Sequence, residues 1–252
     1  MVLKIDELSR DTISYKILGI YGGSKDDYGK KIIMDKDGYV FVGYTWSNDG
    51  DIIDHHGERY SDIWAVKIDF TGNIIWSNCI GGYEYDEKGY DIIKNKDNEY
   101  IIVGESWSKD SDVGVNYGKS DLILVKLNAK GNFEKSKVLG GSDEDRGIRI
   151  TIINDSCYLV IGETKSNDII YSENILSNVG KYDIWILLLD NNFNILGEST
   201  FGGDDEEHPK DFLLDNNRIY IISSTYSYNG VIPNNHGYND FWLLGLELTI
   251  NY

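Results

Sequence analysis

The sequence predicts an all-β fold made of four copies of one unit of four antiparallel strands. A glycine pair recurs at residues 22–23, 81–82, 140–141 and 202–203, and short apolar runs and a Ser-Asn-Asp-rich loop follow each pair. Self-similarity at a fixed spacing marks solenoids and propellers. Four-stranded sheets repeated around an axis form a β-propeller, which usually has four to eight blades. Four units therefore predict a four-bladed β-propeller.

The strands of the first unit are expected at residues 31–35, 39–44, 62–69 and 73–80. These runs are rich in β-branched and aromatic residues and are bounded by Gly, Asn and Asp, which is the signature of strands rather than helices. Residues 35–38 and 70–73 carry the Gly and Asn that tight hairpin turns require. The second run of each unit is apolar on both faces, which favours a strand between two neighbouring sheets.

The repeats predict one domain over residues 1–252, with blades at about 24–80, 83–139, 142–201 and 204–248. The fourth unit ends after its third strand, whereas residues 14–21 have the register of the fourth strand of the first unit. We therefore expect this N-terminal strand to pair with the last blade. The pairing would close the ring and remove an unpaired sheet edge.

Charge and composition exclude some partners. The formal net charge of −18 comes from 42 acidic residues against 24 Lys and Arg, and it repels phosphate backbones and anionic lipids. No apolar run is long enough to span a membrane. We expect no nucleic-acid partner, no membrane insertion, and a monomer that binds a glycan or a protein.

The compartment stays open between two alternatives. Cys79 and Cys157 lie in different repeats and are expected to be free thiols, which exclude neither an oxidising nor a reducing compartment. Residues 1–12 mix charged and isolated apolar residues and leave no signal-peptide core. Composition suggests an AT-rich bacterial gene. The setting is extracellular or at the cell surface if a leader was removed, and cytoplasmic otherwise.

One recurrent line, G-G-x-x-x-x-D … D-G-x-x-x-x-G … S-x-D … D-x-W-x-x-K … G-N-x-x-W, covers almost the whole chain after Ser14. It resembles the repeats, roughly sixty residues long, of bacterial β-propeller surface and secreted proteins. The resemblance implies a propeller and often an exported setting, but no single activity. The first unit carries the line most fully, in Gly22, Gly23, Asp27, Asp37, Gly38, Gly43, Ser47, Asp49, Asp62, Trp64, Lys67, Gly72, Asn73 and Trp76.

Four acidic residues, each five positions after the first glycine of a pair, are the candidate metal ligands. If the first strand of each blade is innermost, they lie near the mouth of the central channel. Hard oxygen donors and few histidines favour Ca²⁺. The alternative is that each acid caps its own turn by accepting backbone N–H bonds. The four are Asp27, Asp86, Asp145 and Glu207.

The aspartates that open the third strand of each unit have the same two interpretations. Hydrogen bonding to nearby backbone groups is the expected role, and ligand binding is the alternative. These residues are Asp62, Asp121, Asp183 and Asp240.

Aromatic residues at a variable position are the candidate ligand contacts. The residue just before the loop serine is Trp46, Trp107, Lys165 or Tyr226. An aromatic face beside carboxylates and amides is a common carbohydrate platform, because the ring covers the C–H face of the sugar. The alternative is that these rings pack between blades.

Histidines are scarce, and their placement singles out the seam between the first and fourth blades. His56 and His236 occupy equivalent loops of those blades, and His208 precedes Pro209 in the fourth. A metal or acid–base site at the seam is one interpretation, and a packing position before a required glycine is the other.

Three functions follow from these patterns. The leading hypothesis is a non-catalytic binding module that holds a glycan or a protein on its acidic loop face, with Ca²⁺ support. The contrasting hypothesis is a carbohydrate-active hydrolase or lyase with Asp27, Asp145, Glu207 and His208 as first suspects. The third is a structural or assembly module, with a contact patch in the third long loop at Ile169, Ile170, Ile175 and Leu176.

Overall fold

A computed structural model describes residues 3–4, 8–9, 12–13, 16–155, 157–169 and 180–248. Every regular element within these ranges is a β-strand, so they contain no helix that could cross a membrane. Both cysteines are free and buried, as expected.

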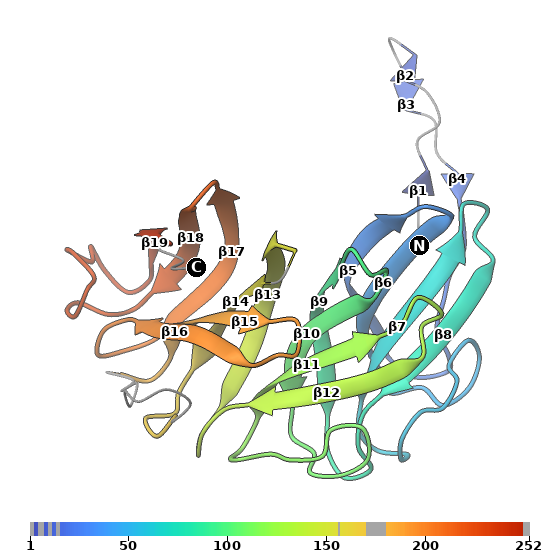
Figure 1. Ribbon diagram of the computed structural model, residues 1–252, viewed down its shortest axis with the longest axis horizontal. Helices are drawn as coiled ribbons and strands as arrows, with labels where there is room; N and C mark the ends of the chain where they lie inside the picture. Colours follow the sequence, from blue (N-terminus) through green and yellow to red (C-terminus); the bar gives the residue numbers. More distant parts are fainter. Residues whose placement is uncertain are drawn as a thin grey trace.

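Four antiparallel sheets, here called blades 1 to 4, make up the body of the protein (Figure 1). Each blade begins with its innermost strand, because the first strands of successive blades contact one another. Blades 1 to 3 have four strands and blade 4 has three. In order, the strands are β5 (Asp27–Asp35), β6 (Gly38–Thr45), β7 (Asp62–Asp69) and β8 (Ile74–Ile80); β9 (Glu87–Lys94), β10 (Tyr100–Ser106), β11 (Asp121–Leu127) and β12 (Phe133–Leu139); β13 (Asp145–Asn154), β14 (Cys157–Thr164), β15 (Asp183–Asp190) and β16 (Ile195–Phe201); and β17 (Glu207–Asp215), β18 (Arg218–Thr225) and β19 (Asp240–Glu247).

The first strand of every blade has a bulge opposite its second strand. The pairing register shifts between Gly29 and Lys31 in blade 1 and at the corresponding places in the other blades. In blade 4 the shift falls between Pro209 and Asp211. A bulge tolerates the proline because it removes the need for a ladder N–H at that point. The first strands start earlier than expected, at Asp27 in blade 1, because the acidic residue already pairs with the second strand.

The core consists of apolar layers between consecutive blades. One layer joins Val42 and Ile63 of blade 1 to Ile102 of blade 2, and similar layers join blades 2 and 3 and blades 3 and 4. Every residue of β10 and of β14 is buried. The second strands are therefore covered on both faces, as their apolar sequences predict. The four blades confirm the all-β, propeller-type fold.

The expectation that the N-terminal strand closes the last blade is wrong in this structure. Lys16 and Ile17 form β4 (Lys16–Ile17), which pairs with β1 (Leu3–Lys4) and not with β19. Another short pair joins β2 (Leu8–Ser9) to β3 (Thr12–Ile13). Within the described ranges, β19 pairs with β18 alone, so blade 4 lacks the expected fourth strand.

The physical reason is that the segment after β4 packs against blade 1. Leu18 is buried with Trp64 and Val66, and the Tyr21 hydroxyl donates a hydrogen bond to the carbonyl of Gly72 at 2.7 Å. The blades consequently follow one another as an open arc, with blade 4 and blade 1 at opposite ends of the long axis (Figure 1).

Candidate functional site

The acid that follows each glycine pair caps the turn of its own blade. The second glycine donates its N–H to the carboxylate of Asp27 at 2.8 Å, of Asp145 at 2.7 Å and of Glu207 at 2.9 Å. Each carboxylate also accepts the threonine hydroxyl at the end of the second strand, from Thr45, Thr164 or Thr225. These bonds are the turn-capping contacts that the sequence offered as the alternative to a cation site.

In blade 2 the capping residue is Glu87 and not Asp86. The Glu87 carboxylate accepts bonds from the N–H of Gly82 at 2.7 Å, the hydroxyl of Ser106 at 2.7 Å and the N–H of Ser108 at 3.2 Å. Asp86 instead accepts the N–H and hydroxyl of Ser61 in blade 1, at 2.7 and 3.0 Å. Glu87 pairs with Ser106 as Asp27 pairs with Thr45, so the turn of blade 2 is one residue longer and counting from the glycines selected the wrong neighbour.

The aspartates that open the third strands hold the long loops. Asp62 accepts the N–H of His56 at 2.8 Å, Asp121 that of Tyr117 at 2.5 Å and Asp240 that of His236 at 2.6 Å. The expected hydrogen bonding to nearby backbone is confirmed for these three.

Their second oxygens lie in an unusual environment. Oδ1 of Asp62 and Oδ1 of Asp121 are buried without a hydrogen-bond partner, and each faces the glycine pair and capping acid of the next blade. Burial, with a smaller contribution from the charge of Asp145, raises the pKa of Asp121 from 3.8 to about 7. Burial likewise raises the pKa of Glu87 from 4.5 to about 7. Two carboxyl groups that face each other across a glycine, as those of Asp121 and Asp145 do, can share a proton.

The carboxylates of Asp27, Asp86, Asp145 and Glu207 do not meet at one centre, since each is bound at its own blade or blade junction. Among the described residues, no three His, Cys, Asp or Glu side chains are grouped so that they could hold a metal ion. The calcium expectation stays a prediction.

The aromatic rim positions have a shared backbone role and different surroundings. In every blade, the residue at this position donates its backbone N–H to the carbonyl of the residue directly before the capping acid. The donors are Trp46, Trp107, Lys165 and Tyr226. All four side chains are half-buried. Among the residues that the structure describes, Trp46 is the one of these four that belongs to a group of rings, with Tyr28 and Tyr44 at centroid distances of 5.9 and 5.4 Å.

The histidines do not meet at a seam. His56 lies between blades 1 and 2, where it contacts Asp62 at 2.8 Å and Asp112 at 3.6 Å, and its hydrogen bond to Asp62 raises its pKa. His236 lies at the free side of blade 4 with 87% of its side chain exposed. His208 lies between blades 3 and 4, with Nδ1 2.8 Å from a Glu163 oxygen.

A row of variable side chains runs along the inner strands, where each blade meets the next. We call this set the inner row: in each blade it consists of the residue after the capping acid and its cross-strand partner on the second strand. The pairs are Tyr28 with Tyr44, Lys88 with Glu105, Arg146 with Glu163, and His208 with Ser224.

Blades 2 to 4 make the ionic part of the inner row. Nε of Arg146 lies 3.6 Å from Glu105 and 2.9 Å from Glu163, and so joins blades 2 and 3. Burial raises the pKa of Glu105, while its hydrogen bond with Tyr90 and the Arg146 charge act to lower it. The hydrogen bond to Glu163 raises the pKa of His208. A cavity of about 460 Å³ opens beside Arg146, Glu163 and His208.

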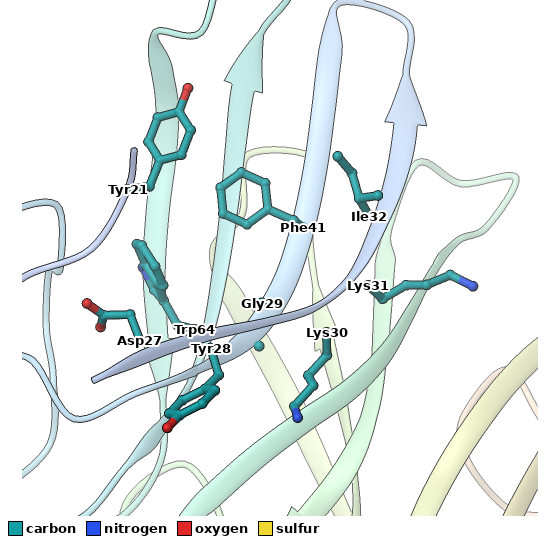
Figure 2. Close-up of a pocket in the computed structure, with 10 residues that line it drawn as sticks. Tyr21, Asp27, Tyr28, Gly29, Lys30, Lys31, Ile32, Phe41 and Trp64 are labelled. Carbon is teal, nitrogen blue, oxygen red and sulfur yellow. The ribbon is translucent and has the colours of Figure 1, made fainter. Parts of the chain in front are cut away.

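Blade 1 makes the aromatic part of the inner row. The rings of Tyr28 and Tyr44 stack at 5.2 Å, and Nζ of Lys30 lies 5.1 Å from the centre of the Tyr44 ring. Nζ of Lys88 lies 5.9 Å from the Tyr44 ring and 4.7 Å from that of Trp107. Figure 2 shows Tyr28 and Lys30 pointing to the same side of β5. They border a cavity of about 370 Å³ whose other lining residues include Tyr21, Phe41 and Trp64 on the opposite side of that strand. Here aromatic rings lie beside the ammonium groups of Lys30 and Lys88, of which Lys88 also lies 3.6 Å from Glu105.

Sequence reasoning found His208 of the inner row, and Trp46 and Trp107 beside it, but missed the other inner-row residues. The sequence does distinguish these residues, because the residue directly after the capping acid differs in every blade. It is Tyr28, Lys88, Arg146 or His208. The misassigned acid of blade 2 shifted that column by one and concealed it. In the third long loop, Ile169 is buried in the core between blades 2 and 3, which contradicts its place in a contact patch; Ile170, Ile175 and Leu176 lie outside the described residues.

Comparisons with known proteins give no functional assignment. No family model matches the chain, and no curated protein matches it. Among solved structures it is similar to an acylaminoacyl peptidase of Pyrococcus horikoshii, with 12% sequence identity and a TM-score of 0.43. The similarity covers 92% of this chain and 34% of that one. A similarity this low says nothing about what this chain does.

Proposed function

We propose that the protein is a non-catalytic binding module whose ligand is an acidic carbohydrate, held at the aromatic part of the inner row. One observation carries the proposal: Lys30 and Lys88 flank the Tyr44 ring within an aromatic group that includes Tyr28 and Trp46. Aromatic faces cover the C–H faces of sugars, and ammonium groups pair with the carboxylates that acidic sugars carry.

The repeated acids support binding rather than catalysis. Asp27, Asp145 and Glu207, three of the four suspects for a glycosidase, each accept a backbone N–H and a hydroxyl from their own blade. A carboxylate that is already saturated by such bonds is poorly placed to transfer a proton to a substrate. The proposal includes assistance by Ca²⁺, which the acidic loops predict. This part is tested separately, by measuring binding with and without chelator.

The test is affinity electrophoresis in gels that contain polygalacturonate or, as the neutral comparison, dextran. Polygalacturonate should retard the wild-type chain and dextran should not. Tyr44→Ala and Lys30→Glu should each weaken the retardation about tenfold, equivalent to about 1.4 kcal/mol. Phe70→Ala and Lys36→Glu are matched controls, because both residues are exposed in the turns at the opposite rim. Equal mobility in both gels would contradict the proposal.

A second candidate function is carbohydrate cleavage at the ionic part of the inner row. It is favoured by His208, whose ring nitrogens lie 2.8 Å from Glu163 and 3.2 Å from Glu206 beside the cavity next to Arg146. Turnover of an acidic polysaccharide that is lost in both His208→Gln and Glu163→Gln would establish it. Binding without release of shorter chains supports the leading proposal.

A further inference from the structure

The outward face of blade 4 has the pattern of an interface between blades. Ile222, Phe241 and Leu243 occupy the positions that Val42, Ile63 and Ala65 occupy in blade 1. The blade 1 residues are fully buried under blade 2, whereas Ile222 is 41%, Phe241 90% and Leu243 68% exposed. This face is built to receive a further blade.

The outward face of blade 1 has the complementary pattern. A methyl group added at Gly89 would lie 2.8 Å from Val42, and one added at Gly147 would lie 2.2 Å from Val103, because the preceding blade packs closely there. At the equivalent Gly29, nothing lies within 4 Å. Ile32 is 47% exposed, although its counterpart Ile92 is fully buried.

Charges alternate along the inner strands, so the charged residue at each end has an oppositely charged neighbour on one side only. The residue after each bulge is Lys31, Asp91, Arg149 and Asp211 in turn. Lys31 lies 3.5 Å from Asp91, and Arg149 lies 3.4 Å from Asp211. The next residue in this alternation after Asp211 would be a lysine at the position of Lys31.

The long loops of neighbouring blades also form an ion pair that would recur at the new junction. Nε2 of His56 in blade 1 lies 3.6 Å from Asp112 in blade 2. Its counterpart in blade 4 is the exposed His236, and the counterpart of Asp112 in blade 1 is Asp51. A blade 1 placed on blade 4 would therefore bring Asp51 to His236.

The segment that ends at Tyr21 lies where the outer strand of a preceding blade belongs. Between blades 1 and 2, the Asn78 side chain of β8 donates to the carbonyl of Gly131 at 2.8 Å. Between this segment and blade 1, Tyr21 donates to the carbonyl of Gly72, the counterpart of Gly131. Docking of the next blade 4 would place its free β19 edge beside this segment.

We propose that a second copy of this chain docks head to tail, with blade 4 of each copy on blade 1 of the other. Blades 1 and 4 of one copy lie at opposite ends of the arc, so the complementary faces meet between copies (Figure 1). Two arcs of four blades complete one ring of eight, which is within the usual range of propellers. This replaces the expectation of a monomer. The carbohydrate site uses the other face of β6, so either proposal can fail alone.

The test is the mass in solution, measured by light scattering during gel filtration over a range of protein concentrations. The wild-type chain should form a species of twice 28.7 kDa. Lys31→Glu and Asp211→Lys should each give single chains, because each places like charges at both junctions. Mixing these two variants should restore the double mass, since every junction then pairs opposite charges.

Closure within one chain predicts that mixing changes nothing, so single-chain mass in the mixture would overturn the proposal. The control pair is Lys130→Glu with Asp97→Lys, at exposed turn positions, and each should keep the double mass alone.

Phe241→Glu is the second variant. Its side chain is exposed in one copy, so the variant should fold normally by circular dichroism but run as a single chain. A folded Phe241→Glu with the mass of the wild type would also overturn the proposal.

Discussion

The carboxylates of Asp121 and Asp145 approach each other across Gly140. A methyl group added at this glycine would lie 1.9 Å from Oδ1 of Asp121 and 2.8 Å from Oδ2 of Asp145. Only a glycine fits between two buried acids of consecutive blades. The repeated glycine is therefore a requirement of the blade junction as well as of the turn.

This arrangement predicts that stability falls as pH rises. The folded-state pKa of Asp121 and Glu87, about 7, lies above their values in the unfolded chain, so the folded state binds more protons between about pH 4 and 7. The free energy of unfolding in urea should decrease by about 2 to 4 kcal/mol between pH 5 and pH 8. Asp121→Asn should flatten this slope and stabilise the protein at pH 8, and Asp97→Asn should leave the slope unchanged. Identical slopes for Asp121→Asn and wild type would contradict the prediction.

The reassignment of the capping acid in blade 2 predicts different effects for neighbouring residues. At pH 8, above the pKa of Glu87, its ionised carboxylate accepts bonds through both oxygens, so Glu87→Gln turns one accepting atom into a donor facing a donor and should cost about 1 to 3 kcal/mol. Asp86 accepts both bonds from Ser61 through Oδ1 alone. Asp86→Asn keeps that oxygen and should change the free energy of unfolding by less than about 0.5 kcal/mol. The reverse order in urea denaturation would restore Asp86 as the capping residue.

Lys67 is a third site where the expected effect is large. Its ammonium group is buried, 2.8 Å from Asp35 and 2.6 Å from Asp37, and Asp35 also contacts Lys94 and Tyr100 of blade 2. Lys67→Met would leave a buried carboxylate with less compensation and should cost about 3 kcal/mol. Lys126→Met is the matched comparison in blade 2. It should cost less, because Glu99, the partner of Lys126, is 24% exposed.

Thiol reactivity gives a fourth prediction. Cys79 is 2% and Cys157 8% exposed, and burial raises the pKa of Cys79. The thiolate is the reactive form, so neither cysteine should react with a chromogenic disulfide reagent in the native protein. Both should react once urea unfolds the chain. Rapid labelling of Cys79 under native conditions would show that blade 1 opens locally.

The sequence predicted the repeated blades because strand-forming runs and turn residues recur with the glycine pairs. It predicted the turn-capping alternative for Asp27 and Asp145, because a carboxylate near tight turns has few other local partners. It did not predict the position of residues 16–21, since their apolar side chains suit the last blade and the first equally well. Contacts between blades, such as Arg146 with Glu105 and Glu163, depend on the rotation of one sheet against the next, which no local pattern encodes.

The capping bonds of Asp145 have a consequence for how such a chain can change in evolution. The turn of Gly141 and the hydroxyls of Thr164 and Ser166 all come from the same repeat as the acid they satisfy. A duplicated or deleted repeat would carry its buried charge together with the groups that solvate it. The number of blades can therefore change by recombination without first creating an unsatisfied acid in the interior.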